Sequence, residues 1–273
     1  MAVQNQRNLY EQYENDTIAV SPFAQSHMGL LTGQTALKIE TYMIACVPFR
    51  LSMKGAMLLG AFSREELVFF QRYAGSLAGL SLVFQPGNSP QPLKIFARCV
   101  LKSVAPMQGK ESIGLITVEW KPCPPDLLGI IGDYFLLLDR LKAEYQDFKT
   151  QRISINAASA HTMGYNNYAV LQYGGGQHKA ALFALASDRL EFLLPMNTPP
   201  LEQGGKLSVK LYFKVAQFSV AAQVAELTRL PNGAQKATLA IGFSPELVDI
   251  IERYRFAERF SAAKGPDQAE PGA

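Results

Sequence analysis

The sequence has few of the residues from which metal and catalytic sites are usually built. Only three cysteines and three histidines occur in 273 residues, and they show no metal-binding spacing. No serine lies in a nucleophile-elbow motif. These absences predict a protein without metal, cofactor or catalytic residues, and so few cysteines are typical of a reducing cytoplasm. The residues concerned are Cys46, Cys99, Cys123, His27, His161 and His178.

Long hydrophobic runs and strong charge are also missing. The longest apolar run, residues 127–138, is interrupted by Asp133 and is much shorter than the roughly 20 residues that span a bilayer. The first ten residues are polar and lack the apolar centre of a secretory signal. A net charge of +3 is too small to indicate nucleic acid as a partner. We therefore expect a cytoplasmic protein without membrane insertion.

One glycine-rich segment has the composition of a phosphate-binding loop. Residues 174–179 read Gly-Gly-Gly-Gln-His-Lys, but neither Ser nor Thr follows the lysine, as that motif requires. Strand-like segments flank the glycines on both sides. The sequence therefore predicts a hairpin turn at 174–176 rather than a nucleotide-binding loop.

What the sequence does contain is an internal repeat. Residues 100–115 and 224–239 have the same length, and each stretch carries a proline and a glycine near its middle. Each is followed by a similar amphipathic segment, at 125–134 and 245–254. Two copies of one unit in a chain of this length predict two similar domains.

Both halves read mainly as short β-strands separated by turn residues. We expect a mainly β fold with two six-stranded antiparallel barrels in tandem, each followed by a helix. The predicted organisation is a barrel at 1–126, a helix and linker at 127–151, a barrel with its closing helix at 152–262, and a disordered tail at 263–273. The predicted strands are 36–40, 80–84, 93–101, 114–120, 168–173, 189–194, 206–213, 218–227 and 237–243.

A helix over residues 127–148 is the most regular prediction. Its apolar residues alternate in steps of three and four, and charged residues occupy the other faces. One interpretation is a helix that closes the first barrel and packs on it. The other is a rigid linker, or a helix through which two chains form a dimer. The apolar residues are Ile131, Tyr134, Leu138, Leu141, Tyr145 and Phe148.

Several runs along the chain resemble the two-domain PilZ proteins of spirochaetes. They are residues 29–39, 48–59, 124–126, 152–156, 169–171 and 239–243. The resemblance implies an N-terminal PilZ-like barrel and a C-terminal PilZ domain joined by a helix and a short linker. It also implies a receptor for the bacterial second messenger cyclic di-GMP, with motility as a regulated process.

The resemblance places the family's Arg-x-x-x-Arg linker motif on residues 148–152. Planar arginines bind phosphates and guanine edges with paired hydrogen bonds. The second arginine is present as Arg152, but Phe148 replaces the first, and Lys149 is one position out of register. Burial of Phe148 would hold this linker down by packing, at about 2–3 kcal/mol.

The family's second motif, an Asp-x-Ser-x-x-Gly turn that contacts guanine, falls on residues 184–189. Ala184 replaces the aspartate, Ala186 the serine and Arg189 the glycine. The corresponding turn in the first half, residues 50–55, keeps the serine and the glycine but has arginine at the first position. We expect its Ser and Gly to preserve turn geometry rather than to bind a ligand.

These departures predict that cyclic di-GMP binding is lost or much weakened. Hydrogen bonds to charged groups contribute about 1.5–3 kcal/mol each, so the missing groups remove roughly 4–7 kcal/mol. Micromolar affinity corresponds to about 8 kcal/mol in total. The expected function is non-enzymatic signalling through an unidentified protein partner.

Two alternatives remain open at this point. One is an active cyclic di-GMP receptor with a non-standard site, formed by Lys149, Gln151, Arg152, Asp188 and Arg189. The other is a nucleic-acid-binding pair of barrels, which is disfavoured because the chain lacks a basic patch with interleaved aromatics.

Overall fold

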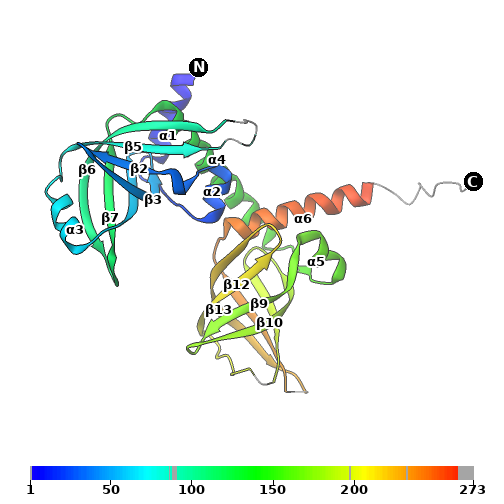
Figure 1. The fold of residues 1–273 in the computed structure, drawn as a ribbon. Coiled ribbons are helices and arrows are strands. Elements are labelled where there is room, and N and C mark those ends of the chain that lie inside the picture. Colours follow the sequence, from blue (N-terminus) through cyan, green and yellow to red (C-terminus); the bar gives the residue numbers. More distant parts are fainter. Residues whose placement is uncertain (1, 86, 88–90, 197, 232, 264–273) are drawn as a thin grey trace, which may run out of the picture. The chain divides into compact units, whose positions relative to one another are not determined.

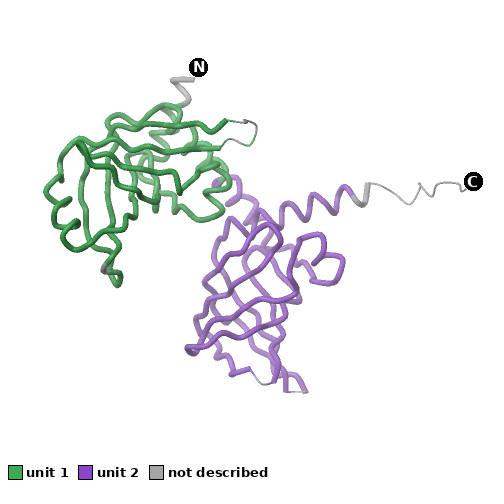
Figure 2. Tube along the Cα trace, in the orientation of Figure 1, with its two compact units in different colours: residues 1–137 green, residues 138–273 purple. Residues whose placement is uncertain are grey.

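A computed structural model describes residues 2–85, 87, 91–196, 198–231 and 233–263. The chain divides into two compact units, Met1–Leu137 and Leu138–Ala273, which Figure 2 shows in different colours. The boundary falls inside one long helix, so this helix contributes residues to both units. We describe each unit by itself.

The first unit is built around a closed six-stranded antiparallel barrel (Figure 1). Its strands run in the order β3-β2-β5-β6-β7-β4, and pairing of β3 with β4 closes the barrel. A short strand, β1 (Thr17–Ala19), adds to β3 from outside. The barrel strands are β2 (Ala36–Ile39), β3 (Tyr42–Ser52), β4 (Gly55–Ala61), β5 (Leu77–Phe84), β6 (Leu93–Met107) and β7 (Lys110–Trp120).

Two helices of the first unit, α2 and α3, begin at residues whose side chains cap them. Ser21 accepts a hydrogen bond from the backbone of Ala24, and Ser63 forms a capping box with Glu66. Such caps satisfy backbone N–H groups that have no partner in the first helical turn. The elements are α1 (Ala2–Tyr13), α2 (Pro22–Met28), the 3-10 helix η1 (Thr32–Gln34), α3 (Arg64–Gln71) and α4 (Pro125–Phe148).

The second unit repeats the plan of the first. Its barrel has the order β10-β9-β12-β13-β14-β11, closed by pairing of β10 with β11, and β8 adds to β10 as β1 adds to β3. The elements are β8 (Ile153–Ser154), α5 (Ala157–Met163), β9 (Tyr165–Tyr173), β10 (Gly176–Leu185), β11 (Arg189–Leu194), β12 (Lys206–Phe213), β13 (Gln217–Arg229), β14 (Gln235–Ile241) and α6 (Pro245–Ala263). Two six-stranded barrels in tandem, each followed by a helix, confirm the predicted fold.

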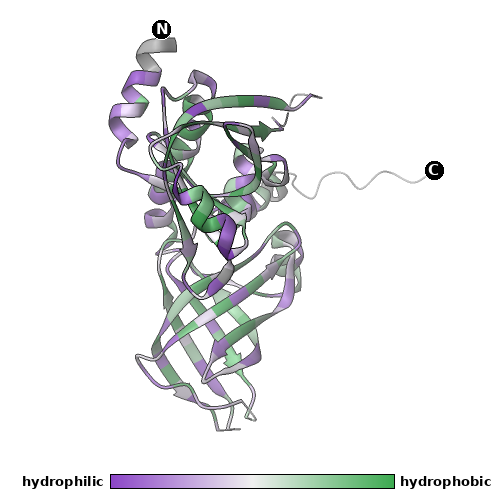
Figure 3. Cartoon of the chain, turned by 60° about the vertical axis from the view of Figure 1, so that its left-hand side comes forward, coloured by the Kyte–Doolittle hydropathy of each residue, from purple (hydrophilic) through white to green (hydrophobic). Residues whose placement is uncertain are grey.

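Alternation of apolar and polar residues along the strands explains the two cores. In β12 every second residue, from Leu207 to Phe213, is buried, as expected where one face of a strand points into a barrel. Hydrophobic and hydrophilic residues are interspersed in this way along the barrel strands in Figure 3. Each barrel is therefore filled by its own side chains.

The predicted hairpin at the glycine-rich segment is confirmed. β9 ends at Tyr173 and β10 begins at Gly176, so two glycines form the loop. Gly174 and Gly175 have φ values of 56° and 75°, the left-handed backbone that a tight hairpin turn of this length needs. Residues Gln177 to Lys179 continue as strand and do not form a loop.

The internal repeat forms two hairpins, β6–β7 and β13–β14, whose bulges do not coincide when residues 100–115 are aligned with 224–239. The pair next to the bulge is Val224 with Leu239 in the second hairpin and Leu101 with Val118 in the first. The equal spacing of 100–115 and 224–239 therefore does not mark equivalent ladder positions. Several elements were not predicted, namely α1, α2, α3, α5, β1, β3, β4 and β8, and β10 was predicted only as the strand that follows the hairpin turn, without bounds.

The apolar seam of α4 is covered within the single chain. In the first unit, Phe135 stacks on Tyr13 with ring centroids 4.8 Å apart, and Gly132 approaches Leu9 of α1 closely. In the second unit, Tyr145 makes an edge contact with Phe243 at 5.6 Å. All six predicted seam residues are buried or half-buried. A dimer through this helix stays a prediction.

The predicted ends of the domains also stay predictions. α4 covers most of the expected helix and linker at 127–151, and α6 extends to Ala263. Residues 264–273, where a disordered tail was expected, lie outside the described residues.

Candidate ligand site on the second barrel

The candidate site lies where the end of α4 meets the turn between β10 and β11. The Ser187 hydroxyl donates a hydrogen bond of 2.7 Å to the Tyr145 carbonyl, so the turn is tied to the helix. Arg189 Nη2 donates one of 3.0 Å to the Lys149 carbonyl, which ties the turn to the linker. The fold therefore brings the predicted linker and turn residues together.

Arg152 is held by a carboxylate of the same unit. Its Nε and Nη2 atoms donate to Oε1 and Oε2 of Glu191 at 2.6 and 3.1 Å, and its Nη1 donates to Ser154 at 2.9 Å. Glu191 is only 10% exposed in its side chain, while Arg152 is 47% exposed. Lys236 Nζ approaches the same carboxylate at 3.7 Å. The guanidinium fork of Arg152 is thus already occupied.

The charges around Glu191 act on its titration. The hydrogen bonds from Arg152 hold the pKa of Glu191 below its ordinary value, although burial opposes them, and Lys236 acts in the same direction. Glu191 in turn raises the pKa of Arg152. The sequence analysis missed Glu191 because it lies in strand β11, two residues beyond the turn motif. Only the pairing of β8, β10 and β11 places it beside Arg152.

The turn itself presents no acceptor at the motif positions. Ala184 and Ala186 are fully buried, and the Ala186 N–H donates to the Arg189 carbonyl at 2.9 Å. The Arg189 side chain is exposed and pairs with Asp188, Nε to Oδ1, at 3.0 Å. Arg189 holds the last position of the predicted turn motif.

The remaining predicted residues lie along the linker. Lys149 Nζ lies 4.6 Å from the ring centroid of Tyr145, and Gln151 is half-buried with its N–H bonded to the Phe148 carbonyl at 3.2 Å. Phe148 is buried, with 6% exposure. Phe183 lies beside the site, with Arg152 and Lys236 at 5.9 and 5.1 Å from its ring centroid.

The equivalent turn of the first barrel keeps a structural serine and glycine. The Ser52 hydroxyl accepts from the backbone N–H groups of Lys54 and Gly55 at 3.3 and 3.1 Å, and it donates to the Gly55 carbonyl at 3.1 Å. A Cβ on Gly55 would lie 2.1 Å from the Val118 carbonyl oxygen, so no larger residue fits. These contacts account for both residues by turn geometry.

Metal sites and membrane-spanning helices can also be assessed for the described residues. They contain no group of three or more His, Cys, Asp or Glu side chains arranged to hold a metal ion. Among the helices that the structure describes, none has the length and apolarity needed to cross a bilayer.

Comparison with known proteins identifies the family. Residues 4–138 match the family model of the PilZN3 domain. The chain therefore belongs to the PilZN3 family, whose domain fills its first half. No curated protein matches it at a significant level.

Solved structures with a similar fold come from several bacteria. PlzA of Borreliella burgdorferi in complex with c-di-GMP is 18% identical, with a TM-score of 0.48 over 93% of this chain and 99% of that chain. YcgR of Escherichia coli in complex with c-di-GMP is 10% identical, with a TM-score of 0.30 over 96% and 91% of the two chains. MotI of Bacillus subtilis, an inhibitor of motility, is 11% identical, with a TM-score of 0.28 over 86% and 99%.

Proposed function

We propose that this chain is a non-enzymatic cytoplasmic signalling protein of the PilZ type that acts through contacts with another protein. In this proposal its second barrel has lost cyclic di-GMP binding or retains it only weakly. The observation that carries the proposal is the paired contact of Arg152 with Glu191. A phosphate ligand would have to displace a nearly buried carboxylate from the one arginine of the linker motif that this chain keeps.

The turn supports the same conclusion. Aspartate and serine at the motif positions would offer oxygen acceptors to a guanine edge, whereas Ala184 and Ala186 offer buried methyl groups. Arg189 replaces a glycine that would let a base approach the backbone. The Arg189 side chain is held over the linker by its hydrogen bond to the Lys149 carbonyl. Three of the groups that read the ligand are therefore absent or replaced.

The linker differs as well. Phe148, in place of the first arginine, is buried and removes a charge from the site. Burying a phenylalanine side chain contributes about 2–3 kcal/mol, enough to favour one linker conformation by more than tenfold. We propose that the linker is held in place without ligand.

Calorimetric titration of the full chain with cyclic di-GMP tests the proposal. We expect no saturable heat at micromolar ligand, because about 4–7 kcal/mol of polar contacts is missing. Low-micromolar binding that disappears in Arg152→Ala would overturn the proposal. The matched control is Lys206→Gln, an exposed lysine of the same barrel outside the site.

Restoring the motif residues tests the proposed cause of the weakened cyclic di-GMP binding. We expect binding to appear when Phe148→Arg and Arg189→Gly are combined with Glu191→Gln, which frees Arg152. The set leaves the fully buried Ala184 and Ala186 unchanged, and because Phe148 and Glu191 are also buried, it is expected to lower stability. Glu191→Gln alone is the control, and circular dichroism confirms that each variant is folded. Failure of the folded triple variant to bind more tightly than wild type would locate the defect outside Phe148, Arg189 and Glu191.

One observation favours a second candidate, an active receptor with a non-standard site. Arg189 and Lys149 are joined by a hydrogen bond, so Lys149, Gln151, Arg152, Asp188 and Arg189 share one surface. In that case wild type binds cyclic di-GMP, and affinity falls steeply with salt and in Arg189→Ala. The protein partner of the first candidate is sought by pull-down with the full chain.

A further inference from the structure

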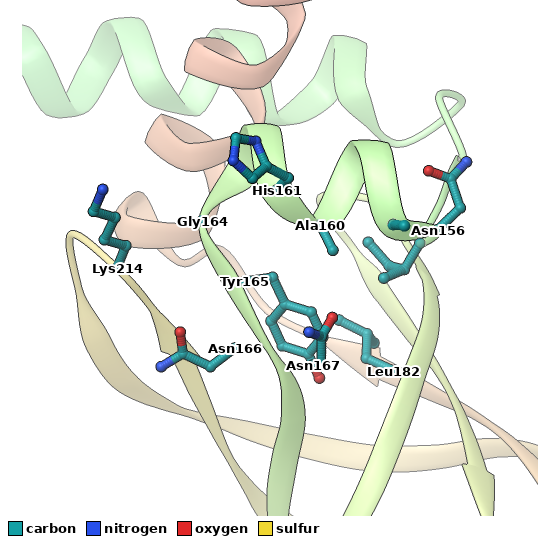
Figure 4. Close-up of a pocket in the computed structure, with 11 residues that line it drawn as sticks. Asn156, Ala160, His161, Gly164, Tyr165, Asn166, Asn167, Leu182 and Lys214 are labelled. Atoms are coloured by element: carbon teal, nitrogen blue, oxygen red, sulfur yellow. The ribbon is translucent and has the colours of Figure 1, made fainter.

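A pocket of about 770 Å³ opens beneath α5 in the second barrel, and it shares no residue with the Arg152 site. It lies where the wall of the barrel separates: β9 pairs with β10 only as far as Ala169 with Ala180. Beyond this pair β9 continues along β12 alone, to Tyr165. The polar residues that line the pocket are Asn156, His161, Tyr165, Asn166, Asn167 and Lys214, and Figure 4 shows them.

The backbone at the separation adopts an unfavourable conformation. Asn167 has a φ of 63°, one of only two positive values among the described residues other than glycine. Non-glycine residues in this region carry strain that tends to persist at functional sites. Here the conformation coincides with the end of the β9–β10 ladder, where the pocket begins.

Tyr165 carries a hydroxyl that the fold does not use. Its side chain is 5% exposed, and the hydroxyl oxygen makes no hydrogen bond in the part of the chain that the structure describes. The first barrel has Leu30 in the same place: each residue follows the left-handed glycine that ends a helix, and each pairs with a phenylalanine, Phe213 or Phe84. The barrel therefore does not need a hydroxyl here, and keeping one unpartnered lowers stability.

The pocket is lined by basic residues and by no acidic ones. None of the lining residues is Asp or Glu, and within the described residues Lys214 and His161 form no salt bridge. Three asparagines add carboxamide groups that both donate and accept hydrogen bonds. Asn156 uses its oxygen to cap α5.

We propose that this pocket binds a small organic anion of about mononucleotide size, with a phosphate or carboxylate group on a body that forms hydrogen bonds. Lys214 balances the charge of the ligand, and the asparagine carboxamides bind its neutral part. A volume of about 770 Å³ falls within the usual range for small-molecule sites. The inference is independent of the function proposed above.

Nuclear magnetic resonance of the full, ¹⁵N-labelled chain tests it with three probes: AMP for phosphate, citrate for carboxylate, and uncharged adenosine. We expect AMP or citrate to shift the amide signals of residues 164–167 and Lys214 saturably at millimolar concentration. Whichever of the two binds identifies the anionic group. Adenosine should bind at least about tenfold more weakly, because it lacks the charge that Lys214 balances.

Two variants separate the pocket from adventitious binding. Lys214→Gln should weaken binding of the anion by about tenfold, while Lys206→Gln, at the start of the strand that Lys214 follows, leaves it unchanged. Tyr165→Phe should keep or raise the melting temperature, since the lost hydroxyl has no partner, and should leave binding unchanged because that hydroxyl is buried. The proposal is overturned if neither anion shifts these signals, if adenosine binds as well as AMP, or if Lys214→Gln binds like wild type.

Discussion

At the scale of single residues, the pair of Arg152 and Glu191 dominates the second barrel's candidate site. The two residues are 39 positions apart in the sequence. Their contact depends on strand register, because Ser154 of β8 and Glu191 of β11 both pair with Ala184 of β10. The sequence motif includes Arg152 but not its partner Glu191, because a local motif does not specify which strands pair or in which register. The resemblance therefore named Arg152 as a candidate site residue but could not show that it is already paired.

Removal of the Glu191 charge should destabilise the protein above pH 5 and have little effect in acid. The folded-state pKa of Glu191 lies below its unfolded value, so its contribution is present above the unfolded pKa of about 4.3 and is lost as pH falls through the folded pKa. For Glu191→Gln we expect a loss of about 1 kcal/mol at neutral pH, modest because Arg152 is half exposed. Urea unfolding of both proteins at several pH values measures this, and a loss that grows in acid would contradict it.

The three cysteines should react slowly with thiol reagents in the native state. Burial raises the pKa of Cys46 and Cys123 to about 12 and that of Cys99 to about 11, so little thiolate is present near neutral pH. Cys123 is the least buried and should be labelled first. Mass spectrometry after timed alkylation gives the order, with urea-unfolded protein as the control. Prompt labelling of Cys46 in native protein would be inconsistent with this arrangement.

At the scale of elements, α4 and the hairpins show what periodicity can predict. The 3.5-residue seam of α4 correctly predicted a helix and its buried face, because those residues repeat along one side. Strand β3 was missed because it contains Pro48, which disfavours a strand in a sequence reading, whereas β10 was expected only as the second strand of a hairpin, because it begins in a glycine-rich segment. Barrel closure stabilises both strands, and that pairing is non-local.

Truncation of Phe148 should destabilise the second unit and loosen the linker. A buried phenylalanine replaced by alanine costs about 3–5 kcal/mol. The control is Leu136→Ala on the same helix, whose side chain is 46% exposed and should cost less than about 1 kcal/mol. Hydrogen exchange of the amides at 149–152 should become faster in Phe148→Ala. Equal protection in both variants would show that packing of Phe148 does not hold the linker.

Two glycines of α4 offer a matched test of helix packing. A Cβ on Gly129 meets nothing within 4 Å, so Gly129→Ala should stabilise the protein by about 0.5–1 kcal/mol through helix propensity. A Cβ on Gly132 would lie 2.8 Å from Leu9 Cδ1 of α1, so Gly132→Ala should gain less or destabilise. Thermal unfolding measures both. An equal gain in the two variants would mean that α1 does not approach α4 as described.

At the scale of the whole molecule, the two units share one arrangement of helices and strands. Each copy has a short outer strand, a capped helix ended by a left-handed glycine, a six-stranded barrel and a trailing helix. The sequence predicted this duplication because turn residues and amphipathic segments recur. It could not predict the capped helices α2 and α5, each seven residues long, because so short a helix has no clear periodicity.

A fragment that ends before α4 should fold less well than one that includes it. Tyr13 stacks on Phe135, and Leu9 lies against Gly132, so residues 1–124 would leave an apolar face of α1 uncovered. We expect residues 1–148 to unfold cooperatively and residues 1–124 to bind a hydrophobic dye or aggregate. Cooperative unfolding of the shorter fragment at the same midpoint would argue that α4 adds nothing to the first unit.

Because α4 contributes residues to both units, neither barrel can be exchanged for another without changing this helix. A recombination event that joined one barrel to a new neighbour would have to cut within this helix, and the donor and acceptor halves would each bring a surface shaped for its own barrel. Inheritance of the pair as a single block is the simplest outcome of such an overlap, and it constrains how chimeras of these proteins can be built.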